Sequence, residues 1–171
     1  MRGPIRRHLL ATFQREFEKR YPNFKRIDSE GIWAQQIAPS LFVFVHLSPF
    51  EGQDIFVVDL AWGETDEIPW NCRNRELNYH EKEWLYRMGR FWKPSGLEPT
   101  FDLTPEEKIA SKARIKAWAR DEPALYPPPV PIATVLTRVE PAVEACLKKF
   151  KKYVVPVFNN LAHSRGLGDI M

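Results

Sequence analysis

Two apolar runs decide the fold: Leu41-Phe-Val-Phe-Val-His-Leu-Ser48 and Asp54-Ile-Phe-Val-Val-Asp-Leu-Ala-Trp62, joined by the turn-rich Pro49-Phe-Glu-Gly-Gln53. Both runs are rich in β-branched and aromatic residues, and together with the short linker they predict an antiparallel hairpin. In the first run, period-2 alternation puts one aliphatic set on one face: Leu41, Val43, Val45 and Leu47. The other face, with Phe42, Phe44, His46 and Ser48, is also largely apolar. We therefore expect a central strand that is at least partly covered on both sides.

Further elements are predicted around this hairpin. Ile5, Leu9, Phe13 and Phe17 recur every four residues and predict a helix over about 5–20. Residues 32–37 read as a strand that completes a three-stranded meander. The run 84–92 fits either a short helix or an edge strand, and we favour the strand. The expectation is a single α+β domain over 1–171, with an antiparallel sheet of three to four strands packed against N-terminal and C-terminal helices.

The C-terminal half contains two predicted helices separated by prolines. Thr104-Pro-Glu-Glu107 combines an N-cap hydroxyl, a proline at the first helical position and a glutamate at the third, so a helix should run from 105 to about 120. The proline-rich stretch 126–131 predicts a stiff polyproline II connector. Together, the segment 104–131 looks like an elaboration of the domain. The longest helix follows, on a stripe formed by Val139, Val143, Cys146, Leu147, Phe150, Val154, Val157 and Leu161, with Pro141 expected to start or kink it and Pro156 to kink it.

Composition limits the class of protein. The chain has 171 residues, of which 44% are hydrophobic and 13% aromatic, enough for one folded domain and too many for a disordered chain. The two cysteines, Cys72 and Cys146, stand apart from other metal-type ligands, so free thiols in a reducing compartment are expected. No run approaches the roughly 20 apolar residues of a membrane span, and we expect a cytoplasmic protein with no membrane contact.

The charge is unevenly distributed, although the formal net charge of +3 is too small to imply nucleic acid. Residues 1–30 carry eight Lys/Arg against four Asp/Glu, whereas residues 51–83 carry nine acids against three bases. An acidic region is therefore expected beside the hairpin. It is either ordinary solvated surface or a contact for a protein partner with a basic surface.

The candidate binding residues are His46, Asp59, Glu64, Asp66 and Glu67. The last four belong to an acidic set that flanks the third strand of the meander and also includes Glu51 and Asp54. Two such carboxylates can hold a divalent cation, but the Glu-x-Lys pattern that a metal-dependent nuclease would show does not follow Asp59. We therefore assign no metal ligand, no catalytic residue and no cofactor. A structural histidine is the simpler interpretation of His46.

A basic run, Lys148-Lys-Phe-Lys-Lys152, offers a nucleic-acid surface as an alternative. Phe150, however, falls on the apolar stripe of the last helix, which leaves the lysines on an ordinary solvated face. Nucleic acid is accordingly the less favoured partner.

The order of a helix, a three-stranded meander ending in Asp59-Leu-Ala-Trp62, then Arg90-Phe-Trp92 and a long C-terminal helix resembles small uncharacterised bacterial α+β domains of unknown function. The resemblance covers residues 5–62 and 139–163 and implies a fold but no site residues. The leading functional hypothesis is a non-enzymatic cytoplasmic module that binds a protein partner through its acidic surface. The alternatives are a small-ligand or metal-binding enzyme that uses polar residues of the sheet, and nucleic-acid binding through the basic C-terminal helix.

Overall fold

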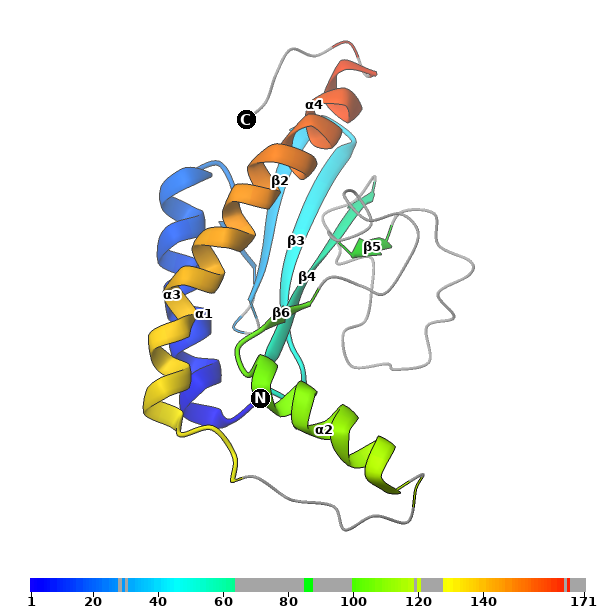
Figure 1. The fold of residues 1–171 in the computed structure, drawn as a ribbon. Coiled ribbons are helices and arrows are strands. Elements are labelled where there is room, and N and C mark those ends of the chain that lie inside the picture. Colours follow the sequence, from blue (N-terminus) through cyan, green and yellow to red (C-terminus); the bar gives the residue numbers. More distant parts are fainter. Residues whose placement is uncertain are drawn as a thin grey trace.

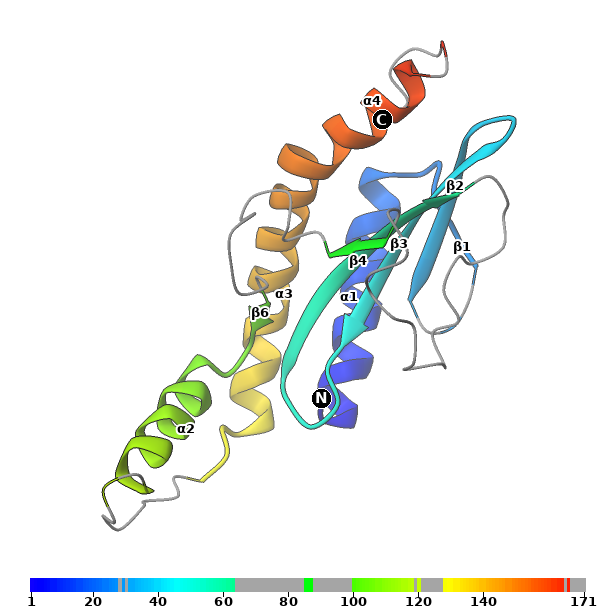
Figure 2. The same ribbon diagram turned by 90° about the vertical axis from the view of Figure 1, so that its right-hand side faces the viewer.

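The computed structural model describes residues 1–27, 29, 31–63, 85–87, 100–118, 120, 128–164 and 166. An antiparallel sheet carries helices along one of its faces (Figure 1). The view turned by 90° separates the helix layer from the sheet and shows one helix projecting from the lower end of the molecule (Figure 2). The predicted α+β class is confirmed.

Within the described residues, the sheet has six strands: β1 (Lys25–Arg26), β2 (Ile32–Ala38), β3 (Leu41–Pro49), β4 (Ile55–Gly63), β5 (Leu85–Arg87) and β6 (Phe101–Asp102). Their order is β1-β2-β3-β4-β5, and β6 also pairs with β4. The predicted meander is β2-β3-β4, with β3 at its centre. Sequence reasoning expected three or four strands because two-residue strands such as β1 and β6 have no periodicity to detect. β5 confirms a strand at 85–87, and the rest of the run 84–92 lies outside the described residues.

The described helices are α1 (Gly3–Arg20), α2 (Pro105–Trp118), α3 (Ile132–Lys149) and α4 (Val155–His163), with a π-helical turn, η2 (Phe150–Val154), between the last two. α3 begins directly after Pro131, so Pro141 lies inside the helix and does not start it. The predicted interruption at Pro156 coincides with a π turn directly before it, in which the N–H of Val155 bonds to the carbonyl of Phe150. Proline lacks the N–H that an α-helix needs at this point, which explains a change of helix type here.

The main core lies between the sheet and the helices α1 and α3. The predicted stripe of α1 is buried, and Phe17 is the centre of an aromatic cluster. Its ring centroid lies 5.4 Å from those of Phe13 and Trp33, 5.2 Å from that of Phe24 and 5.5 Å from that of Phe150. One side chain thus joins α1, the sheet and η2.

Salt bridges and a second apolar face complete the packing. α1 and α3 run side by side in the same direction, and Arg15 contacts Glu140 at 3.3 Å while Arg20 contacts Glu144 one turn further on (Figure 1).

On the face of the sheet away from these helices, Ile32, Phe44, Val57 and Ala61 are buried as well. The prediction that β3 is covered on both sides is therefore confirmed at Phe44.

Replacing Phe17 should test the aromatic cluster. We expect Phe17→Ala to lower the free energy of unfolding by about 3–5 kcal/mol, the range for large-to-small changes of buried aromatics. Urea denaturation followed by circular dichroism measures it. Lys19→Ala, an exposed change in the same helix, should stay within about 0.5 kcal/mol of the parent protein. If Phe17→Ala does not fold, Phe17→Leu can replace it, with a smaller expected loss in the free energy of unfolding. If the variant at Phe17 loses no more of this free energy than Lys19→Ala does, the role of the cluster is contradicted.

Candidate functional site

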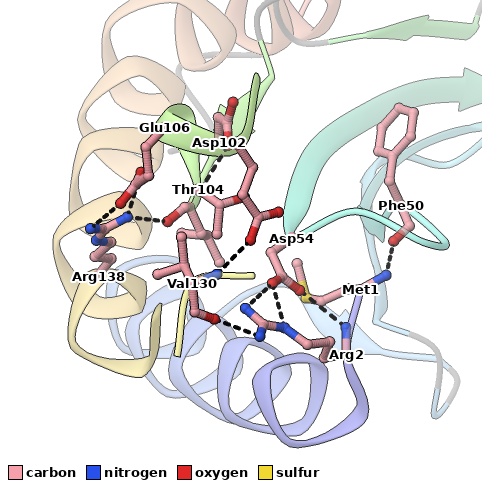
Figure 3. A network of polar contacts seen from close by, with 11 residues as sticks. Met1, Arg2, Phe50, Asp54, Asp102, Thr104, Glu106, Val130 and Arg138 are labelled. Carbon is pink, nitrogen blue, oxygen red and sulfur yellow. Dashed lines mark hydrogen bonds and ion pairs between the residues drawn. The ribbon is translucent and has the colours of Figure 1, made fainter. Parts of the chain in front are cut away.

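Asp54, in the turn between β3 and β4, is a buried carboxylate with 5% of its surface exposed. Arg2 neutralises it from two directions: the Arg2 backbone N–H donates to Oδ1 at 3.1 Å, and Nε donates to Oδ2 at 2.7 Å (Figure 3). The buried Nη2 of Arg2 lies 2.6 Å from the same Oδ2 as a charge contact without an aligned hydrogen bond. Asp54 is thus bound inside the protein, which corrects its place in the predicted acidic set: it offers no charge to a partner.

The same carboxylate stabilises the start of α1. This helix has no acidic residue in its first turn, and the side chain of its N-cap residue, Arg2, makes no capping hydrogen bond. A negative charge next to a helix N-terminus interacts favourably with the helix dipole. Asp54 supplies that charge from a turn far along the chain and receives the N–H of the N-cap residue.

Arg2 and Asp54 also connect three other segments. Nη1 of Arg2 donates to the carbonyl of Val130, just before α3, at 2.6 Å. The carbonyl of Asp54 accepts a hydrogen bond from Leu103, next to β6, at 2.9 Å. The backbone nitrogen of Met1 donates to the carbonyl of Phe50 in the same turn (Figure 3). The start of α1, the β3–β4 turn, β6 and the entry to α3 therefore meet at one place.

Helix α2 is attached beside this place by its first turn. Arg138 of α3 donates to both carboxylate oxygens of Glu106, at 2.9 and 2.6 Å, and to the carbonyl of Leu103 at 2.9 Å (Figure 3). The carboxylate of Glu107 accepts the backbone N–H of Val130 at 2.8 Å. We call Glu106, Glu107, Val130 and Arg138 the α2 anchor. Bidentate Arg–carboxylate pairs fix direction as well as distance, so the anchor sets the orientation of the helix.

The predicted start of this helix is confirmed, but its bonds differ from the expected capping box. α2 begins at Pro105 as predicted. In a capping box the glutamate would reach back to the N–H of Thr104. Here that N–H donates to Asp102 Oδ1 at 2.8 Å instead, and Glu107 turns to Val130. The glutamate therefore serves a tertiary contact, which a local pattern cannot reveal.

Beyond its anchor, α2 buries none of its described side chains. Ile109 is 69% exposed and Ile115 is 63% exposed. We define the α2 face as the exposed positions that follow the first turn: Ile109, Lys112, Ala113, Ile115 and Lys116. Sequence reasoning found the helix but not its exposure. The available signal was the spacing of six between the two isoleucines, which fits no single stripe that a core would bury.

The structure brings together two of the predicted binding residues, His46 and Asp59. They lie opposite each other in the β3–β4 register, and Nδ1 of His46 is 3.9 Å from Oδ2 of Asp59, with side chains 15% and 18% exposed. Arg87 is the β5 residue opposite Asp59. An imidazole and a carboxylate so placed form an ion pair once the imidazole is protonated, and both residues also make other contacts. Glu64, Asp66 and Glu67 lie outside the described residues.

Two further predicted features are accounted for by packing. Cys146 is fully buried in α3, and burial raises the pKa of its thiol well above the ordinary value, so it is not a thiolate nucleophile at neutral pH. In the basic run, Phe150 is buried as predicted, the Lys149 ammonium lies 5.3 Å from the Phe101 ring centroid, and Lys148 lies 3.7 Å from Glu144.

Two features are absent from the described part of the chain. In that part, His, Cys, Asp and Glu nowhere gather in a group of three or more that could hold a metal ion. Its helices, moreover, include none with the length and apolar character needed to cross a membrane.

Removing the partner of Asp54 should destabilise the fold. We expect Arg2→Met to lower the free energy of unfolding by about 3 kcal/mol, the lower end for broken buried ion pairs, because the Arg2 side chain keeps 30% of its surface exposed. Chemical denaturation measures the change. Arg6→Met removes the same charge from an exposed position of α1 and should have an effect within about 0.5 kcal/mol. Equal effects of the two substitutions would contradict the assigned role of Arg2.

The α2 anchor should respond to pH through Glu106. The hydrogen bonds from Arg138 lower the pKa of this exposed carboxyl. A lowered pKa in the folded state means that the contribution to stability is present above the ordinary glutamate pKa of about 4.3 and is lost as the pH falls through the folded value. An NMR titration should find Glu106 titrating below an ordinary glutamate, and Arg138→Leu should return its pKa toward the ordinary value.

Glu16 provides the control for this titration, because Arg15 lowers its pKa independently of Arg138. Its titration should not change in the Arg138→Leu variant. A Glu106 pKa that stays the same in that variant would show that Arg138 does not hold the carboxylate in solution.

Comparisons with known proteins identify no relative. No protein-family model matches the chain, and neither the curated proteins nor the solved structures contain a match. A function for this chain therefore has to be inferred from its own residues and their contacts.

Proposed function

We propose that this protein is a non-enzymatic interaction module that binds another protein through the α2 face. The observation that carries the proposal is the combination of a helix fixed in direction by bidentate contacts at its first turn and two largely exposed isoleucines beyond it. Burying an exposed aliphatic side chain of this size is worth about 1.5–3 kcal/mol, so two of them provide a substantial driving force for association.

The anchor lowers the cost of such binding. A helix of 14 residues is only marginally stable by itself in water, and a partner that had to order it would lose affinity to that ordering. The Arg138–Glu106 pair and the Glu107–Val130 bond hold the first turn before any partner arrives. α2 is thus presented in a conformation ready for a groove on a partner.

The acidic surface suggested by the sequence is a second proposed contact of the same module. Of its described members, Glu51 is exposed, Asp54 is bound to Arg2, and Asp59 lies beside His46 in the sheet. Glu64, Asp66 and Glu67 continue this acidic segment in the sequence. We keep it as a proposal for a partner with a basic surface, distinct from the α2 face.

Site-specific photo-crosslinking tests the α2 proposal. Benzoylphenylalanine in place of Ala113, one turn from Ile109 on the α2 face, should give a discrete protein adduct in a lysate of the source organism. The same probe in place of Arg7, an exposed position of α1, should not. Ile109→Ser combined with Ile115→Ser should lower the adduct yield at least roughly fivefold without changing the melting temperature. Equal adducts at both probe positions, or none at Ala113, would refute the proposal.

A further inference from the structure

The exposed part of α2 carries charge of a single sign. From residue 108 to its end at residue 118, α2 has four bases, Lys108, Lys112, Arg114 and Lys116, and no acid. The two acids of the helix, Glu106 and Glu107, are both bound in the anchor. In the part of the chain that the structure describes, Lys112 and Lys116 are exposed, and no ion pair reaches their ammonium groups. The α2 face is thus an aliphatic surface with uncompensated positive charge.

We infer that the partner of the α2 face is an acidic protein segment that covers Ile109 and Ile115 with apolar side chains and places carboxylates next to Lys112 and Lys116. This inference rests on the proposed function. Lys112 lies between the two isoleucines along the helix, and Lys116 lies one turn beyond it. Because an α-helix turns by about 100° per residue, Ile109 and Ile115 lie about 120° apart around α2, with Lys112 and Lys116 between them. A partner that wraps around this side of the helix and covers both isoleucines would therefore meet both ammonium groups, and carboxylates on the partner would complement them.

Other occupants fit these residues less well. A second copy of this chain would bring Lys112 and Lys116 of one α2 face against the same two lysines of the other, because the acids of α2 are already used. A nucleic-acid backbone would pair with the lysines but would leave the isoleucines without apolar cover. A lipid surface favours helices whose apolar and basic residues occupy opposite faces, whereas here both kinds share one face.

Selection from a random peptide library displayed on phage, with the immobilised full chain as bait, tests the inference. The enriched peptides should be net acidic and contain aliphatic residues. Fluorescence anisotropy with a synthetic copy of an enriched peptide should show affinity that falls as salt rises. Lys112→Glu combined with Lys116→Glu should weaken binding at least roughly tenfold.

A matched control keeps the test specific. Lys19→Glu combined with Lys151→Glu makes the same change in charge at exposed positions of α1 and η2, and should alter affinity less than about twofold. Neutral or basic peptides, no enrichment, or tighter binding of a DNA duplex or of phosphatidylserine vesicles to the α2 face would overturn the inference. An adduct at Ala113 together with neutral peptides would leave the proposed function standing and refute only the acidic partner.

Discussion

One buried carboxylate, that of Asp54, lies where the start of α1, the β3–β4 turn, β6 and the entry to α3 meet. Asp54 cannot remain charged at 5% exposure without partners, because an isolated ion in a protein interior is costly. Arg2 provides the opposite charge, and by doing so it fixes the first residues of α1 against the β3–β4 turn. The guanidinium then reaches Val130, and the Asp54 backbone reaches Leu103. The helix layer and the sheet are thereby joined at the end of the molecule where α2 is attached.

This junction explains why α2 has a direction although it buries so little. Leu103 is hydrogen-bonded both to Asp54 and to Arg138 of the α2 anchor. Val130 is hydrogen-bonded both to Arg2 and to Glu107 of that anchor. The contacts form a connected set that runs from the core to the first turn of the helix (Figure 3). Connected polar contacts of this kind hold geometry through several partners at once. The helix is consequently fixed near residue 106, and beyond its first turn none of its described side chains is fully buried.

The sequence predicted the helices and strands whose buried residues recur at a regular spacing. Alternation assigned the two faces of β3 correctly, and spacing by four assigned the buried stripe of α1, because burial imposes these periods over several turns or residues. Asp54 was misplaced for the opposite reason: its partner Arg2 is remote in sequence, so the turn reads as a solvated acidic loop. Glu107 was misassigned for the same reason. The residues around it indicate a capping box, but its carboxylate accepts a hydrogen bond from Val130, which is remote in sequence. His46 and Asp59 were predicted within one hairpin, and only the register could place them opposite each other.

The identities of Ile109 and Ile115 are not explained by folding. Isoleucine is a poorer helix former than alanine, lysine or glutamate because branching at Cβ restricts its rotamers in a helix. An exposed position gains no burial in return, so a polar or unbranched residue would serve the isolated fold better at both sites. Scattered exposed apolar residues are common on proteins. These two, however, lie next to Lys112 and Lys116, which have no ion pair within the described residues, on a helix whose acids are both engaged in its anchor. The proposed contact with a second molecule would account for both the isoleucines and the one-sided charge, and no contact within the described residues does.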